Sequence, residues 1–117
     1  DDHLYEYREE VQSVYDGETC KMNIDLGLGT WLQNEKMRLA RINTPELRGD
    51  ERPAGLIARD FLRDKIDGKQ VFISTLKDKK GKYGRYIAEI WVLDADNNYA
   101  NVNDELVNAE YAKYVEY

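Results

Sequence analysis

Apolar and polar residues alternate through the first part of the chain. In residues 5–15 (YEYREEVQSVY) the apolar positions Tyr5, Tyr7, Val11 and Tyr15 recur at even spacing, and residues 20–27 (CKMNIDLG) alternate in the same way. A period of two is typical of a strand that buries one face. The Asp-Gly pair between these segments favours a tight hairpin. Residues 36–42, 70–76 and 85–93 predict three further strands.

Two other segments have the period of an amphipathic helix. In residues 51–68 Pro53 suits the first turn and Gly68 the exit, and the predicted apolar face consists of Ala54, Ile57, Ala58, Phe61 and Leu62. In residues 102–115 Asn103 is the predicted N-cap. Three strands, a helix, two strands and a helix predict an α+β fold, a five-stranded β-barrel of the OB type with helices after strands 3 and 5.

Size and composition indicate a single domain over residues 1–117, large enough to bury a core. No apolar run approaches the length that crosses a bilayer, so we expect no membrane partner. One cysteine, Cys20, permits no internal disulfide and is interpreted as a buried thiol.

The net charge of −6 hides a basic middle, because residues 36–85 contain 14 Lys/Arg against 7 Asp/Glu. That region could meet a polyanion, although charge fluctuation along the chain is an equally good explanation.

Two arginines lie at or near the ends of predicted strands. Arg38 stands between Met37 and Leu39, and Arg85 begins the fifth strand. A guanidinium held at a strand end presents a planar fork of donors that fits two oxygens of a phosphate. Taken singly, however, a solvated or salt-bridged barrel residue is the favoured interpretation of each.

Oxygen-bearing side chains occur in two of the predicted turns, Asp16 and Glu18 in YDGET and Asn43 and Glu46 in INTPE. Oxygen ligands from two turns on neighbouring strands suit a hard cation such as Ca²⁺ or Mg²⁺. A cation beside two arginines would stabilise the transition state of phosphodiester cleavage, and a glutamate could take a proton from water. Spacing alone does not locate such a site, because acidic hairpin turns are commonly just solvated.

Four segments in order, VYDGET, MRLARINTPE, KYGRYIAEIWV and VNDELVNAEYA, resemble the signature segments of the staphylococcal nuclease (thermonuclease) family. The resemblance extends from about residue 11 to residue 112. It implies an OB-like barrel and calcium-dependent hydrolysis of DNA and RNA, with a preference for unpaired strands and 3′-phosphate products. By this resemblance Arg38 and Arg85 are similar to the family's phosphate-binding arginines and Glu46 to its general base. Pro45 would orient Glu46 toward the attacking water.

The resemblance also implies substrate-binding positions. Lys82 and Tyr83 match positions that hold a second phosphate of the nucleotide, although Tyr83 is equally suited simply to pack. Tyr114 and Tyr117 are candidates for the family's substrate-contacting tyrosines. The family commonly has a glycine where Glu110 stands, so we expect the last helix to run on toward Val115.

The implied metal site departs from the family pattern. Its ligand positions are Glu18, Asn43 and the carbonyl of Thr44, with Asp16 close by, whereas the family has aspartates at the first two. Glutamate reaches about 1.5 Å further than aspartate, and asparagine lacks the charge, which weakens a Ca²⁺ site. Three outcomes stay open: weaker Ca²⁺ use, preference for Mg²⁺ or Mn²⁺, or loss of catalysis.

The resulting hypothesis is a monomeric nuclease whose partners are DNA and/or RNA. Water activated by Glu46 attacks in line, and a divalent cation, first of all Ca²⁺, assists. The alternative is a catalytically weak or inactive OB-fold module that binds nucleic acid or protein, and a third interpretation is a domain excised from a longer chain. A secreted, envelope-associated or phage-encoded origin would each suit the family.

Overall fold

The computed structural model describes residues 6–25, 27–80 and 86–115, with side chains for residues 11–25, 27–74 and 86–115. Its elements follow in the order β1 (Glu6–Asp16), β2 (Thr19–Asp25), β3 (Trp31–Leu39), β4 (Ile42–Asn43), a 3₁₀ turn η1 (Gly49–Glu51), α1 (Arg52–Ile66), β5 (Gln70–Lys80), β6 (Tyr86–Leu93), β7 (Tyr99–Asn101), α2 (Val102–Asn108) and β8 (Lys113–Tyr114). In the described part of the chain, no helix has the length and apolarity needed to cross a membrane.

Five of the strands close into a barrel. They are hydrogen-bonded in the order β3-β2-β1-β5-β6, and β3 pairs again with β6 in parallel, with Arg38 opposite Ile87 and Leu39 opposite Ala88. The other pairings in the barrel are antiparallel. This closure removes the free edges of the sheet. It confirms the predicted OB-type barrel, and β7 extends β6 outside it.

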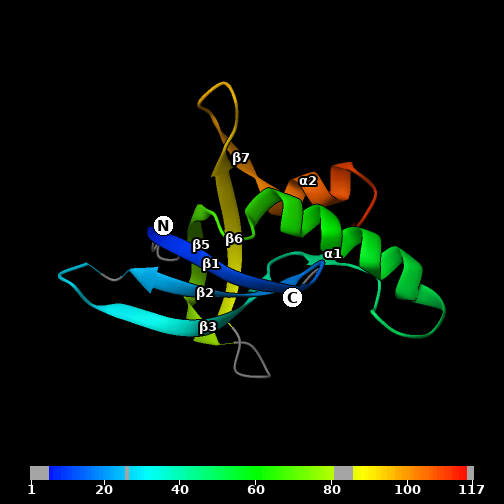
Figure 1. Cartoon of the computed structure of the whole chain (residues 1–117), viewed down its shortest axis with the longest axis horizontal. Coiled ribbons are helices and arrows are strands. Elements are labelled where there is room, and N and C mark those ends of the chain that lie inside the picture. The colour runs from blue at the N-terminus through cyan, green and yellow to red at the C-terminus, as the bar shows by residue number, and fades with distance from the viewer. Residues whose placement is uncertain (1–5, 26, 81–85, 116–117) are drawn as a thin grey trace.

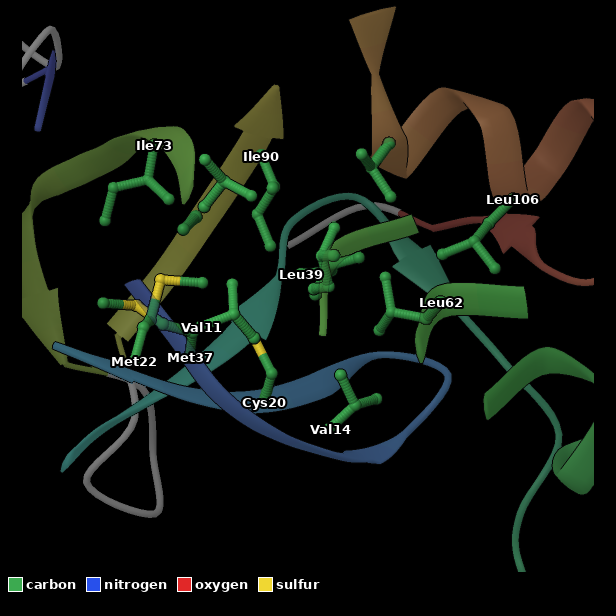
Figure 2. Close-up of a cluster of buried hydrophobic side chains, with 14 of the residues drawn as sticks. Val11, Val14, Cys20, Met22, Met37, Leu39, Leu62, Ile73, Ile90 and Leu106 are labelled. Carbon is green, nitrogen blue, oxygen red and sulfur yellow. The ribbon is translucent and has the colours of Figure 1, made fainter. Parts of the chain in front are cut away.

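The interior of the barrel is filled by the alternating apolar positions of the strands. Met22, Met37 and Ile73 are fully buried there. Both helices lie on the same side of the barrel (Figure 1) and are in contact with each other. Leu62 from α1 and Leu106 from α2 extend the core beside Leu39 (Figure 2). The helices therefore cover the barrel end at which β3 stops.

Helix α1 buries a different stripe from the predicted one. Ala58 and Leu62 are buried as predicted, but Ile57 is 53% exposed and Ala54 is exposed as well. The buried stripe begins at Gly55 and ends at Ile66. The hydrophobic pattern did not predict that Gly55 is buried, because a glycine has no side chain. It is buried since the helix backbone approaches the chain around residue 46 at this point.

The start and the end of α2 also differ from the prediction. Asn101 is the N-cap, and its side chain accepts a hydrogen bond from the Asp104 N–H at 2.9 Å. Asn103, the predicted cap, is fully buried inside the helix. Its side-chain amide donates to the carbonyls of Ala40 and Ala88, and its oxygen accepts from the Ile90 N–H. Asn103 thus attaches α2 to the barrel.

The prediction that the helix continues toward Val115 is wrong. Helix α2 ends at Asn108, and Glu110 adopts the left-handed conformation with φ of 67°. The Glu110 N–H donates to Val107 O and the Tyr111 N–H to Leu106 O, each at 2.9 Å. This is the Schellman arrangement that terminates helices, here with a glutamate at the position that glycine usually takes. The chain then turns back, and β8 pairs with β4.

Candidate functional site

A polar cleft of about 660 Å³ opens at the barrel end that carries the β1–β2 turn. On one side it is lined by that turn and by the segment from Asn43 to Glu46, and on the other by residues 110–115. Seven of the predicted site residues line it: Asp16, Glu18, Arg38, Asn43, Thr44, Glu46 and Tyr114. Tertiary structure thus brings two separate sequence motifs into one site, which we call the cleft.

Two hydrogen bonds made by the backbone of Glu18 fix its position at the end of the β1–β2 turn. The Asp16 carboxylate accepts a hydrogen bond from the Glu18 N–H at 3.0 Å, an arrangement that favours a tight turn. The Glu18 carbonyl accepts from the Leu39 N–H at 2.8 Å. The Glu18 side chain consequently lies between the ends of β2 and β3, close to Arg38.

Arg38 is nearly buried, with 8% of its surface exposed, and its guanidinium contacts three groups among the described residues. Nη2 lies 2.5 Å from Glu18 Oε2 and donates to Asn43 Oδ1 at 2.6 Å, while Nη1 donates to the carbonyl of Leu39. A buried guanidinium needs such partners because an unpaired charge in a dry interior is costly. Arg38 is therefore a phosphate-binding candidate that already holds an internal anion.

Thr44 completes the contacts of Glu18. Both the backbone N–H and the hydroxyl of Thr44 donate to Glu18 Oε1, at 2.8 and 2.9 Å. With Oε2 bound to Arg38, both carboxylate oxygens of Glu18 are engaged by the protein. One carboxylate therefore bridges Arg38 and Thr44.

Two glycines, one in α1 and one in the β1–β2 turn, allow both elements to pack closely against residues 44–46. A Cβ at Gly55 would overlap the carbonyl oxygen of Glu46 and lie 2.9 Å from its carbonyl carbon, and a Cβ at Gly17 would lie 2.8 Å from side-chain atoms of both Thr44 and Ala58. No real Cβ occupies such distances, so any larger residue would displace α1 or the turn. These two glycines fix the turn between the β1–β2 hairpin and α1.

Glu46 differs from Glu18 in its surroundings. Its side chain is exposed, and it makes no hydrogen bond or ion pair with any residue that the structure describes. Its backbone N–H donates to the carboxylate of Glu51 at 3.2 Å. A solvated carboxylate at the cleft is free to accept a proton from water. Glu51 is a cleft residue that sequence reasoning missed, because nothing in its position before α1 separates it from an ordinary first-turn acid.

Two of the four proposed metal ligands, Glu18 and Asn43, are bound by other groups in this arrangement. Asn43 Oδ1 and Glu18 Oε2 both contact the Arg38 guanidinium, and Glu18 Oε1 is held by Thr44. Among the described residues, no group of three or more His, Cys, Asp or Glu side chains is arranged to hold a metal ion. The positive charge that these oxygens surround is that of Arg38.

The remaining predicted residues Arg85, Lys82 and Tyr83, and the candidate Tyr117, lie outside the described residues. Tyr114 lines the far side of the cleft, is 53% exposed and donates from its hydroxyl to Asp104 at 2.8 Å. This hydrogen bond raises the pKa of Tyr114. Arg41 lies over the Tyr114 ring, 5.6 Å from its centroid, which anchors β8 against β4.

Cys20 is inert, as its alternation within β2 predicted. It is 1% exposed, and burial, assisted by the nearby charge of Asp16, raises the pKa of its thiol to about 12. A thiol of this pKa is protonated at neutral pH and is a poor nucleophile. The chemistry of the cleft therefore does not involve it.

Comparison with known proteins agrees with this architecture. The sequence profile of the family described as Staphylococcal nuclease homologue matches residues 36–117. An uncharacterised protein of Methanocaldococcus jannaschii is 30% identical over 92% of this chain, and a thermonuclease of Staphylococcus intermedius is 28% identical over 86% of it. The matched regions span 58% of the length of each relative. The chain belongs to the staphylococcal nuclease homologue family.

Proposed function

We propose that this chain hydrolyses phosphodiester bonds in single-stranded DNA or RNA. The observation that carries the proposal is that a fork-shaped guanidinium, Arg38, and a solvated carboxylate, Glu46, line the same polar cleft. Family membership and the similarity to a thermonuclease support it. Retention of Arg85 immediately before β6 in the chain supports it as well.

In this mechanism Arg38 binds the scissile phosphate through its donors and stabilises the charge that develops on the phosphoryl oxygens. Glu46 takes a proton from water, the water oxygen attacks phosphorus in line, and the bond from phosphorus to the 5′ oxygen breaks. The phosphate stays on the 3′ end, the leaving 5′ oxygen takes up a proton from solvent, and Glu46 releases its proton to solvent. Arg85 is assigned to the charge on that leaving oxygen.

The phosphate must compete with Glu18 for Arg38. The Glu18 carboxylate is held at 2.5 Å from Arg38 and is anchored by two donors from Thr44, so it is a strong internal competitor. No step is assigned to a cation here, because the side-chain oxygens of two candidate ligands, Glu18 and Asn43, already contact Arg38 and Thr44. The Ca²⁺ dependence expected from the resemblance stays a prediction.

The test is a cleavage assay on heat-denatured DNA and on RNA, with Ca²⁺, Mg²⁺ and Mn²⁺ titrated separately and a chelator control. We expect Glu46→Gln to lower the rate roughly 100-fold or more, since a general base contributes about that much. Asp50→Asn is the matched control, because Asp50 is an exposed acid just before α1 that does not line the cleft. Cleavage products should block primer extension until a phosphatase removes the 3′-phosphate.

Equal rates for the wild type and Glu46→Gln would contradict the assignment of the base. The closed contact between Arg38 and Glu18 favours one second candidate, a barrel that binds nucleic acid without cutting it. Salt-sensitive oligonucleotide binding by a folded protein that cleaves nothing with any of the three cations would select that candidate.

A further inference from the structure

A second hollow of about 930 Å³ lies between the outer face of β1–β3 and helix α1, next to the cleft. Five of its lining residues carry positive charge, and none of the described lining residues is an aspartate or glutamate. We call it the basic groove and define it by Lys21, Lys36, Arg52, Arg59 and Arg63. Four of these cations belong to the basic middle of the chain, residues 36–85, and Lys21 joins them from β2.

The strand side of the basic groove places two like charges together. Lys21 and Lys36 are directly opposite each other in the β2–β3 pairing, and both are exposed on the outer face. Like charges in opposite positions of an antiparallel pair repel each other and weaken the sheet. Neither lysine has an ion-pair partner among the described residues. A bound anion would relieve this repulsion.

The helix side supplies arginines at positions 52, 59 and 63 of α1, a spacing that places them along one side of the helix. Arg63 donates through two nitrogens to the carbonyl of Val14, and Arg52 donates to the carbonyl of Leu47. A carbonyl orients a guanidinium without neutralising it, and each arginine keeps further donors. Arg59 contacts the exposed neighbour Asp60, which does not line the groove.

The basic groove adjoins the cleft. Thr19 lines both hollows, and it pairs in the sheet with Arg38 of the cleft. Glu46 lines the cleft and the next residue, Leu47, lines the groove. The groove also contains Tyr15, whose side chain is 69% exposed. Basic residues along a hollow together with an exposed aromatic ring are the combination that binds single-stranded nucleic acid.

We propose that the basic groove binds the backbone of a single-stranded nucleic acid whose scissile phosphate lies in the cleft, with Tyr15 stacking on a base. The proposal rests on the proposed function, because that function places the scissile phosphate in the cleft. It adds a binding site for nucleotides beyond the cleavage point, formed by residues of β2, β3 and α1. A long strand is then held by more phosphate contacts than a dinucleotide.

The test measures binding of fluorescent oligonucleotides by anisotropy, with every protein carrying Glu46→Gln and in a chelating buffer, so that cleavage is suppressed with or without a metal requirement. The strands are a dinucleotide and an oligomer of about 12 nucleotides, within the range of site sizes of OB-fold proteins. The variant is Lys21→Glu/Lys36→Glu. The matched control is Lys65→Glu/Lys69→Glu, which changes the net charge equally at positions that line neither hollow. Circular dichroism checks that each variant is folded.

We expect the groove variant to bind the longer oligomer roughly tenfold more weakly or worse and to lose about one to two units of salt slope, while dinucleotide binding changes little. The control should stay within about twofold of the protein that carries Glu46→Gln alone. Tyr15→Ser should weaken binding of the oligomer without changing the salt slope. An unchanged oligomer affinity in the groove variant, or an equal loss in the control, would overturn the proposal.

Polyglutamate of matched length is the comparison polyanion. Binding as tight as that of the oligomer would mean a general anion surface and would overturn the assignment to nucleic acid. The readout also separates the two proposals. A protein that cleaves nothing but shows the groove-dependent length effect refutes only the nuclease, and one that cleaves without the length effect refutes only the groove.

Discussion

The cleft and the basic groove meet at Thr19, and each contains arginine, but the surroundings of the positive charge differ. Arg38 is 8% exposed and is surrounded by oxygen atoms of Glu18, Asn43 and Leu39. Four of the groove cations, Lys21, Lys36, Arg52 and Arg63, are exposed, whereas Arg59 is half-buried and paired with Asp60, and the described residues that line the groove include no carboxylate. The difference follows from burial: a desolvated cation must be paired, whereas a hydrated one need not be.

This comparison separates a positive charge that stabilises the fold through internal partners from positive charges that remain accessible to a ligand. Removing Arg38 would leave the Glu18 carboxylate, held by Thr44, without its counter-charge. Removing a groove lysine would relieve repulsion and leave nothing unpaired. The same substitution type should therefore have opposite effects on stability in the two hollows, and the predictions below follow from that contrast.

The largest effect is expected for Arg38→Ala. Breaking a buried ion pair by removing one partner typically costs about 3–5 kcal/mol, and the residual exposure of Glu18 places the expected loss near the lower value. Urea unfolding measures it. The double variant Arg38→Met/Glu18→Gln should recover most of the loss, because a glutamine side-chain oxygen can still accept from Thr44. A loss below about 1 kcal/mol in the single variant would show that the pair behaves as an exposed one.

A smaller loss is expected for Gly55→Ala, which tests how closely α1 supports the turn that carries Glu46. Helix propensity alone predicts a gain of about 1 kcal/mol. A Cβ that overlaps the Glu46 carbonyl oxygen instead predicts a loss of about 2 kcal/mol, with impaired cleavage. The sign of the change in unfolding free energy decides between them. Ala54→Gly, at the exposed neighbouring position, measures the propensity effect by itself.

The smallest effect, of opposite sign, is expected for Lys36→Thr. Removal of the charge opposite Lys21 should raise the unfolding free energy by a few tenths of a kcal/mol at low salt. The gain should vanish at high salt, where exposed charges are screened. Lys21→Thr should give a similar gain, and the two gains should not add. A loss of unfolding free energy of more than about 0.5 kcal/mol lies beyond the usual range for surface substitutions. It would mean that Lys36 stabilises the sheet through a contact other than those described.

Much of the fold could be predicted from local patterns. The Asp-Gly turn before Glu18 follows from turn chemistry, and the strands follow from alternation that the barrel interior then buries. The errors fall where two local signals compete. Asn101 and Asn103 are both good caps, and only packing against Ala40 and Ala88 makes Asn103 a buried residue. Glu110 is an ordinary helix former that the returning chain forces into the left-handed conformation.

The candidate site was predicted in part. Arg38, Glu18, Asn43 and Glu46 were named from motifs, and the structure places them in one cleft. The sequence did not indicate that Glu18 would bind Arg38, since the two residues are related only through the β2–β3 register. The excess of Lys and Arg in residues 36–85 was read from the sequence, but the basic groove was not predicted. Its cations come from β2, β3 and α1, which only the fold brings together.

The sequence by itself determined the OB-type order of elements, the turn that holds Glu18 and the residue types available for phosphate chemistry. These depend on local periodicity and on side-chain identity, which are readable along the chain. Tertiary structure alone decided that Glu18 and Asn43 surround Arg38, that Gly55 allows α1 to approach Glu46, and that five cations share one groove. Those features depend on distances between residues far apart in sequence, which exist only once the barrel closes.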